Sequence, residues 1–309
     1  MATLLYSDPA CREHRPGRRH PERPERLDAV LDRLATPGYA PLLRRRPPAA
    51  DVETLSRVHR AGYVDATLEA VPAEGRAFLD PDTAVSPGSR AAALLAAGAC
   101  VAAVDAVLAG EADNAFCAVR PPGHHAEADR AMGFCLFNNV AVAALHARAA
   151  HGLRRVAVVD FDVHHGNGTQ AVFYADPDLF YGSTHQYPYY PGTGARSERG
   201  VAGNIVNEPL AAGSGSAEFR AAMRDSMLPA LAAFAPELVL VSAGFDAHAA
   251  DPLADIRLTE EDFAWVTGEL MALADRHCAG RLVSTLEGGY DLGALADSVG
   301  AHVAALMAS

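Results

Sequence analysis

The sequence predicts an α/β fold, in which a parallel sheet is covered by helices on both faces. Two observations predict it. Short apolar runs alternate along the chain with longer stretches of helical periodicity. Four of these runs end in polar, glycine-containing tails. At 309 residues the chain can form one large domain or two smaller ones, and no linker favours two. We therefore expect one domain over residues 1–309.

The expected strands are short apolar runs. The run VAVV at 156–159 is typical of a strand buried on both faces, because its residues are β-branched or small and do not alternate with polar ones. Runs of the same type predict strands at 3–6, 115–119, 156–161, 179–181, 204–206, 238–242 and 282–286. Helical periodicity predicts helices at 26–34, 89–108, 138–150, 217–233, 260–275 and 292–307.

Composition excludes several classes of protein. The 26 Lys and Arg residues against 38 Asp and Glu residues leave a formal charge of −12, which argues against nucleic acid as the main partner and mildly favours cationic substrates. The exception is an arginine-rich stretch at 11–26, where interleaved glutamates predict a solvated or salt-bridged surface. The five cysteines are odd in number and lack CxxC spacing, so we expect neither a disulfide framework nor a thiolate metal cluster.

These features fit a cytoplasmic protein with no membrane partner. The N-terminus reaches a charged residue by Asp8 without a hydrophobic core of signal-peptide length. The one segment that resembles a membrane span, residues 91–108, is mostly alanine and contains Asp105, which would cost about 3 kcal/mol at the bilayer centre. We expect this segment to be a helix buried in the protein.

The polar tails indicate a functional site. In an open parallel sheet, ligands bind at the carboxyl ends of the strands, where the loops converge. One such tail alone would be an ordinary turn, but four together indicate shared chemistry. The tails are RPPGHHA after 115–119, DVHHGNG after 156–161, AGFDAH after 238–242 and EGGYDL after 282–286.

One tail predicts a metal site. Asp160, Asp162 and His164 lie at i, i+2 and i+4, so they should project to one side as the strand ends. An Asp, a His and a second Asp from elsewhere would leave open positions on a metal, an arrangement suited to Zn²⁺ or Fe²⁺. Asp246 is the best remaining donor, because it also follows an apolar strand. The alternative is an Asp–His pair that caps the next helix.

Another tail predicts acid–base chemistry. His124 and His125 lie on a loop that follows Pro-Pro-Gly, and an imidazole beside a metal can take a proton from water and pass it to a leaving group. Each needs an orienting acceptor, and Asp160 and Asn167 are the polar groups left over in the neighbouring tail. Tyr290 follows two glycines, which allow its hydroxyl to approach a developing oxyanion.

Together these stretches resemble the zinc-dependent histone deacetylase family, which includes acetylpolyamine amidohydrolases and bacterial deacetylase-like amidohydrolases. The likeness extends from His20 to Leu292 and is closer to the class II branch. It rests on HPERPERL, RPPGHHA, GFCLFNN, DFDVHHGNGTQ, YYPGTG, SAGFDAH and EGGY. The resemblance implies an arginase/deacetylase-like single catalytic domain, with a mostly parallel sheet of about eight strands flanked by helices.

The resemblance also implies the metal ligands. Asp162, His164 and Asp246 would bind Zn²⁺, with Fe²⁺ as an alternative. A structural K⁺ would use Asp160, the backbone at Asp162 and His164, and Ser183.

Further roles come from the same resemblance. His125 would be the general base and acid, His124 its electrostatic partner bonded to Asp160, and Asn167 would orient His125. Arg23 would match an arginine that lines the family's internal acetate-exit channel.

Substrate contacts are implied as well. Tyr290 would polarise the acyl oxygen, and the carbonyl of Gly133 would accept the amide N–H. Phe134 and Tyr190 would flank the acyl-lysine stem, although aromatic residues in such stretches are often part of the core. Leu253 occupies the position where polyamine-selective members have a glutamate, seven residues after the metal-binding aspartate.

The expected function is zinc-dependent hydrolysis of an acyl amide, most simply the deacylation of acyl-lysine in proteins or peptides. The alternative is an amidohydrolase that acts on acetylpolyamines or other small acyl amines. A manganese ureohydrolase would need a second set of metal ligands, which the motifs lack. A non-catalytic module that binds acyl-lysine would not need Tyr290 and the two histidines.

Overall fold

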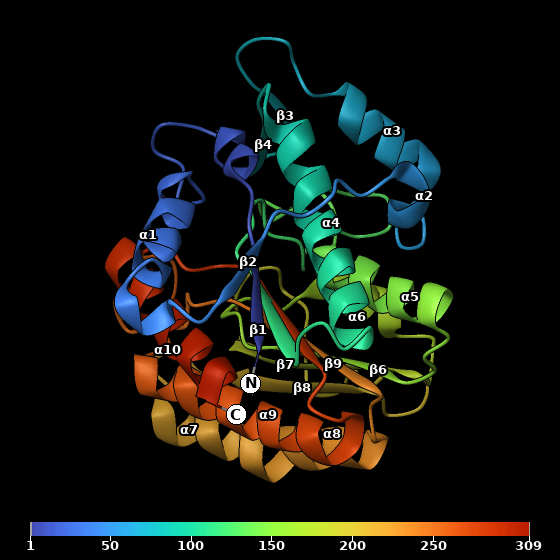
Figure 1. Cartoon of the computed structure of the whole chain (residues 1–309), viewed down its shortest axis with the longest axis vertical. Coiled ribbons are helices and arrows are strands. Elements are labelled where there is room, and N and C mark those ends of the chain that lie inside the picture. The colour runs from blue at the N-terminus through green and yellow to red at the C-terminus, as the bar shows by residue number, and fades with distance from the viewer. Residues whose placement is uncertain (1, 309) are drawn as a thin grey trace.

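A computed structural model describes residues 2–308, and its centre is an eight-stranded sheet in the order β2-β1-β5-β10-β9-β6-β7-β8 (Figure 1). Every neighbouring pair of strands in this sheet is parallel. A separate antiparallel hairpin consists of β3 (Ala77–Asp80) and β4 (Thr83–Val85). The sheet strands are β1 (Thr3–Tyr6), β2 (Leu43–Arg45), β5 (Asn114–Cys117), β6 (Val156–Asp160), β7 (Leu179–Gln186), β8 (Ile205–Leu210), β9 (Leu238–Ala243) and β10 (Leu282–Leu286).

Helices cover both faces of the sheet (Figure 1). On one face α4 (Ser89–Leu108) packs on β5 and α5 (Asn139–His151) packs on β6, and the two helices contact each other. On the other face α9 (Glu260–Cys278) contacts β9 and α10 (Leu292–Ala308) contacts β5. The remaining helices are α1 (Glu25–Leu34), α2 (Val52–Leu55), α3 (Ala61–Glu69), α6 (Asn167–Phe173), α7 (Ser216–Ala222) and α8 (Leu228–Phe234).

The predicted fold class is confirmed, and each predicted apolar run forms a strand of the sheet. The predicted helix at 217–233 is divided, because a π-helical turn at Met223–Met227 separates α7 from α8. No apolar pattern predicts β2, because its three residues are all exposed. The β3–β4 hairpin and the short helices α2, α3 and α6 were also missed.

Helix α4 is long and apolar enough to cross a membrane by length and composition, and 61% of its most apolar window is buried inside the protein. Most of its buried residues belong to the main hydrophobic core or to a smaller cluster beside it. A Cβ at Gly98 would lie 2.0 Å from the carbonyl oxygen of Pro48, so the chain at 48–50 packs directly on the helix. This burial agrees with the prediction of a core helix.

The strand order determines where the polar tails meet. β5, β10, β9 and β6 are consecutive in the sheet, and they are the four strands that the tails follow. Because the strands are parallel, all four tails leave from the same edge. Residues far apart in the sequence, such as His124 and Tyr290, are therefore brought to one edge.

A buried ionic cluster attaches the N-terminal segment to this edge. Glu22 has no exposed surface, and it pairs with Arg120 at 2.7 Å and with Arg26 at 3.3 Å. His14 also faces it, with Nε2 3.4 Å from Glu22 Oε2. Burial is the largest single effect and would raise the pKa of Glu22, but the charges of Arg120, His14 and Arg26 together outweigh it and lower this pKa to about 2.

We predict that Glu22→Gln lowers the free energy of unfolding by about 3–5 kcal/mol, because it leaves two arginines buried beside a neutral amide. Urea denaturation at pH 7 measures this loss. Glu25→Gln is the matched control, since Glu25 is exposed on the same segment and should change stability by less than about 0.5 kcal/mol. Equal stability of the two variants would contradict the prediction.

The same pair predicts a pH dependence. The pKa of Glu22 is lower in the folded protein than its ordinary value of 4.5, so its stabilisation is fully present above about pH 4.5. It is lost as the pH falls towards 2. Glu22→Gln should therefore reduce the difference in stability between pH 5 and pH 3 relative to the wild type.

Candidate active site

Three potential metal ligands meet where β6 and β9 end. His164 Nδ1 lies 3.1 Å from Asp162 Oδ1 and 3.1 Å from Asp246 Oδ2, and all three side chains are buried. The donor atoms of the three residues lie within 4.8 Å of one another. Neighbouring ligands of a tetrahedral ion with bonds near 2.0 Å are about 3.3 Å apart. The structure therefore brings the predicted ligand set together with spacings that suit one ion.

The outer oxygens of the two carboxylates are held by the backbone. Asp162 Oδ2 accepts the N–H of Gly288 at 2.8 Å, and Asp246 Oδ1 accepts the N–H of Val163 at 2.9 Å. A Cβ at Gly288 would lie 2.0 Å from Asp246 Oδ2, so only glycine allows this close approach. Two buried carboxylates and an imidazole that face one another fit a divalent cation, which would balance their charge.

His124 and His125 lie beside this group, on the loop after β5. His124 Nδ1 donates to Asp160 Oδ2 at 2.9 Å, and His125 Nδ1 donates to Asn167 Oδ1 at 2.9 Å. These are the pairings that the resemblance implies. Because an amide oxygen can only accept, His125 carries a proton on Nδ1, and the lone pair of its Nε2 is available in the neutral form.

The environment separates the pKa values of the two histidines. Burial alone would lower the pKa of His124, but the carboxylates of Asp160 and Asp162 outweigh it and raise this pKa to about 10. For His125, burial and then the charges of His124 and His164 lower the pKa well below its usual value. The pair thus combines a cationic imidazole with a neutral one that can accept a proton.

A cavity of about 130 Å³ leads to these groups. Burial raises the pKa of Tyr290 well above its usual value, so its hydroxyl keeps its proton and can donate. Gly133 has φ +56°, and a Cβ there would lie 2.3 Å from His125 Cδ2, so the position requires glycine. Leu253 and Asp82 also line the cavity. Its other lining residues are His125, His164, Tyr290, Gly133, Phe134 and Tyr190.

The bend after β6 produces the convergence of the ligands. The strand ends at Asp160, and the next residues form bends, so the alternation that predicted one shared face stops before Asp162. Asp160 Oδ2 accepts from His124 and from the hydroxyl of Tyr181 at 3.0 Å, whereas Asp162 and His164 turn towards Asp246. Asp160 therefore supports a histidine and is separate from the ligand group.

The proposed potassium site remains a prediction. Ser183 on β7 lies opposite Asp160 in the register of the sheet, and both residues are buried. Ser183 Oγ lies 2.9 Å from His185 Nδ1.

Two carboxylates of the site were missed by the sequence analysis. Glu287 is buried directly after β10, and its Oε2 accepts the N–H groups of Gly123 at 2.6 Å and His124 at 3.2 Å. Glu287 is the first residue of the EGGY tail, and this position directly after an apolar strand could have identified it as a site residue. Asp82 accepts the N–H of Gly133 at 3.0 Å, but it comes from the β3–β4 hairpin, which carried no recognisable pattern.

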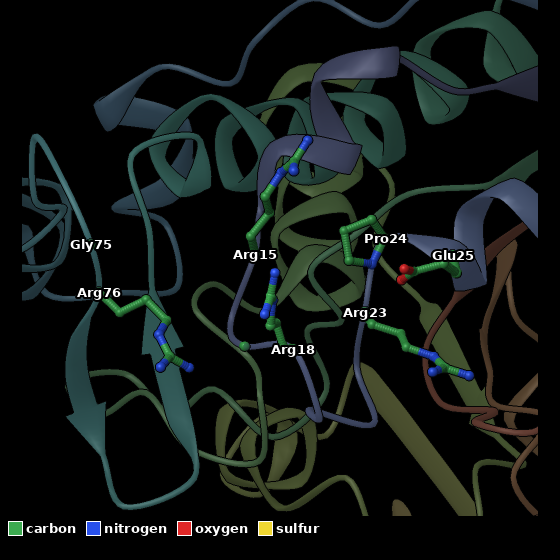
Figure 2. Close-up of a pocket in the computed structure, with 8 residues that line it drawn as sticks. Arg15, Arg18, Arg23, Pro24, Glu25, Gly75 and Arg76 are labelled. Carbon is green, nitrogen blue, oxygen red and sulfur yellow. The ribbon is translucent and has the colours of Figure 1, made fainter.

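The expectation for Arg23 is wrong, because this residue lines a surface pocket of about 520 Å³ and does not reach the interior of the site. Figure 2 shows Arg23 around this pocket with Arg15, Arg18 and Arg76. The buried arginine is Arg26. Its guanidinium lies 4.9 Å from the ring centroid of Tyr290, and it donates at 2.5 Å to the carbonyls of Glu287 and Gly289.

Comparison with known proteins identifies similar chains. Residues 20–306 match the family described as "Histone deacetylase domain". The chain is 46% identical to a "Histone deacetylase-like amidohydrolase" of Pseudomonas aeruginosa over 274 residues, which cover 87% of this chain and 71% of that protein. It is 43% identical to "Polyamine deacetylase HDAC10" of Homo sapiens, over 96% of this chain and 45% of that protein. The solved HDA15 HD domain superposes with a TM-score of 0.93 at 37% identity, over 100% of this chain and 88% of that one.

We predict that Asp162→Asn loses one metal ion per chain together with the activity, because the amide removes a negative ligand while preserving the shape of the side chain. The affinity for that ion should fall by at least about a hundredfold. Metal analysis after dialysis measures the loss. Asp65→Asn, at an exposed position of α3, is the control. Unchanged metal content in Asp162→Asn would contradict the assignment.

Proposed function

Because the chain belongs to the histone deacetylase family, we propose that it is a zinc-dependent deacylase that acts on acyl-lysine in proteins or peptides. Its relatives are named deacetylases or amidohydrolases, so hydrolysis of an acyl amide is the activity they share. One observation supports the more specific proposal that the substrate is acyl-lysine. A single narrow cavity contains a potential metal ligand, a neutral histidine, a phenol and two aromatic walls.

The walls of the cavity suit a linear, apolar stem. Phe134 and Tyr190 both line it, and the ring of Tyr190 lies 5.2 Å from that of His125. A cavity of about 130 Å³ suits a slender group such as an acylated alkyl chain. Gly133 lies beside His125, and its carbonyl accepts only the weak donor Cys135 Sγ at 3.3 Å, which leaves a lone pair for the N–H of the amide that is cleaved.

The reaction is the addition of water to the acyl carbon, followed by loss of the amine. When bound, the ion supplies Lewis acidity, which polarises the acyl carbonyl and makes water nucleophilic near neutral pH. His125 Nε2 takes the proton from the attacking water and returns it to the leaving nitrogen. Asn167 holds His125 in the required tautomer. The products are acetate or another short acid and a free amine.

Tyr290 stabilises the charge that develops on the acyl oxygen. Its hydroxyl is protonated and lines the same cavity as His125 and His164. A donor aimed at a developing oxyanion typically contributes two to three orders of magnitude to turnover. Asp251 Oδ2 accepts the N–H of Tyr290 at 2.8 Å and Oδ1 accepts that of Leu253 at 2.9 Å, so one carboxylate fixes both residues.

Two other functions are less consistent with this site. A ureohydrolase would need a second metal beside the first, and within residues 2–308 the other group of potential ligands, Asp105, His146 and His151, lies on α4 and α5. A non-catalytic binding module would not require a neutral histidine, its oriented tautomer and a buried phenol in one cavity.

Substrate class depends on the mouth of the cavity. Leu253 lies there and offers an apolar contact, which favours a peptide backbone over a distant ammonium group. The relative named a polyamine deacetylase keeps the small-amine alternative open. Asp82 is a carboxylate of the cavity wall, but its Oδ1 already accepts from Gly133 N–H and the hydroxyl of Thr83.

We predict that Tyr290→Phe reduces kcat for an acetyl-lysine peptide by roughly a hundredfold or more, because one oxyanion donor is lost. Metal content and melting temperature should not change. Tyr174→Phe is the control, since Tyr174 is 40% exposed outside the cavity. A kcat near that of the wild type would mean that Tyr290 does not act on the acyl oxygen.

We also predict that the wild type has a higher kcat/KM for acetyl-lysine peptides than for acetylspermidine. Leu253→Glu should move this ratio towards the polyamine by about fivefold, equivalent to roughly 1 kcal/mol, because it adds a charge partner for the distant ammonium. Leu253→Gln introduces a side chain of the same size as glutamate but without the charge, so it should not change this ratio. A higher kcat/KM of the wild type for acetylspermidine would contradict the proposed substrate class and favour an amidohydrolase that acts on small acyl amines.

A further inference from the structure

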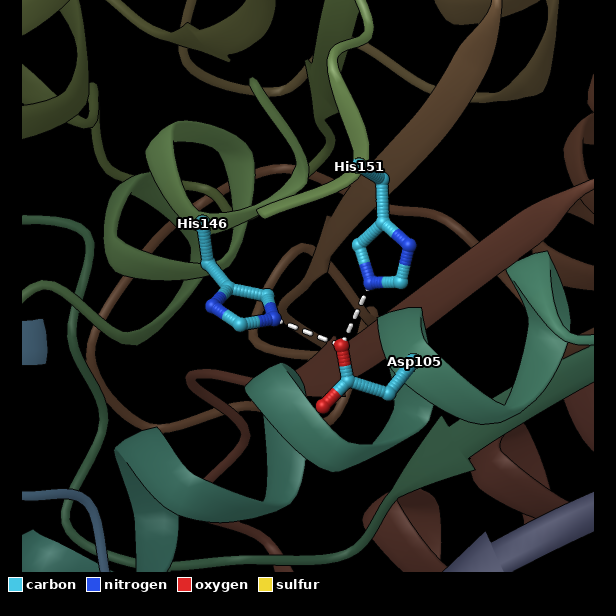
Figure 3. A group of neighbouring side chains, drawn as sticks. All are labelled: Asp105, His146 and His151. Carbon is cyan, nitrogen blue, oxygen red and sulfur yellow. Dashed lines mark hydrogen bonds and ion pairs between the residues drawn. The ribbon is translucent and has the colours of Figure 1, made fainter. Parts of the chain in front are cut away.

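A second cluster of metal-binding side chains lies outside the active site, between α4 and α5 (Figure 3). Asp105 comes from α4, and His146 and His151 come from α5. Asp105 Oδ1 lies 2.6 Å from Nε2 of His146 and 2.6 Å from Nε2 of His151. Figure 3 shows both imidazoles directed at this one carboxylate. The proposed function leaves this cluster unused.

The cluster lies at the edge of the sheet opposite to the active site. The active-site tails leave the carboxyl ends of the strands, whereas α4 and α5 end just before β5 and β6 begin. Asp105 and His151 lie in the last turns of these two helices. The C-terminus of a helix carries a partial negative charge, so the ends of both helices favour a cation at this place.

The donor atoms suit a particular class of ion. Two imidazole nitrogens and one carboxylate oxygen favour Zn²⁺ and the neighbouring transition metals over Mg²⁺ or Ca²⁺, which prefer oxygen ligands. The donor atoms lie within 4.8 Å of one another. His146 is 11% exposed and fixed, while Asp105 at 49% and His151 at 30% can adjust and leave room for water as a further ligand.

We propose that Asp105, His146 and His151 bind a divalent transition-metal ion such as Zn²⁺, which links α4 to α5. The ion replaces the two Nε2 protons that now point at Asp105. In each neutral imidazole the proton moves to Nδ1 by exchange with water, and no further reactant is needed. Asp105 Oδ1 must move from 2.6 Å to about 3.3 Å from each imidazole Nε2, a shift that rotation of the exposed Asp105 side chain supplies.

One neighbouring residue opposes the ion. Arg57 Nη1 lies 2.6 Å from His146 Nδ1, and a guanidinium can only donate, so it favours the tautomer with the proton on Nε2. Metal binding needs the opposite tautomer. Arg57 is half-buried and must move aside, which lowers the affinity of the site. Removal of this side chain should therefore tighten metal binding.

The experiment is a Zn²⁺ titration of the metal-free protein, followed by calorimetry and by metal analysis after dialysis. The wild type should bind two ions per chain, and His151→Ala should bind one, because loss of one of three ligands weakens the site by at least about a hundredfold. His277→Ala is the matched control, an exposed histidine near the end of α9, and it should bind two. Asp162→Asn should keep the ion between α4 and α5 and lose the other, which separates this proposal from the proposed function.

Arg57→Ala provides a test that does not depend on loss of binding. It should bind the second ion several-fold more tightly than the wild type, and Zn²⁺ should raise its melting temperature further. One ion per chain in the wild type, or two in His151→Ala, would overturn the proposal. Weaker binding by Arg57→Ala would also overturn it, because the ion would then not be held by His146.

Discussion

The parallel alignment of four adjacent strands is the constraint on which the site depends. β5, β10, β9 and β6 lie side by side and run in one direction, so the four loops that follow them share one edge of the sheet. No single loop contains a complete site. The potential metal ligands come from two loops, the histidine pair from a third and the phenol from the fourth. The chemistry therefore follows from strand order as much as from residue type.

The buried charges at this edge are held in place by partners that are buried as well. Asp160 supports His124, and Glu287 accepts two backbone N–H groups from the same loop. Unpaired charges of this kind would be strongly unfavourable, so each carboxylate must be satisfied. Asp162 accepts a backbone N–H at each oxygen and Asp246 at one, and Asp162 Oδ1 and Asp246 Oδ2 both face His164 Nδ1. A divalent cation would balance the negative charge of the two carboxylates, so the same ion would stabilise the site and take part in its chemistry.

The sequence predicted the fold class and many residues of the candidate site, because these residues belong to contiguous tails behind apolar strands. His124, Asp162 and Tyr290 could be selected from such tails before any contact was known. Asp82 could not, because it lies in the turn of a short hairpin that carries no recognisable strand pattern and whose first strand is mostly half-buried. Arg23 was assigned from the resemblance alone, and Arg26, three positions further on, was not considered. Only the packing of α1 buries Arg26 and leaves Arg23 at the surface pocket.

The most direct test is a crystal structure of the zinc-loaded His125→Ala variant with an acetyl-lysine peptide, which this variant should bind without hydrolysing, with anomalous data collected at the zinc edge. We expect an anomalous peak within about 2.0–2.2 Å of the carboxylates of Asp162 and Asp246 and of His164 Nδ1. The acetyl oxygen should lie between this peak and the hydroxyl of Tyr290. The absence of a peak at this site would contradict the assignment of the metal ligands. A peptide that binds with its acetyl group outside the cavity would contradict the assignment of the acyl site.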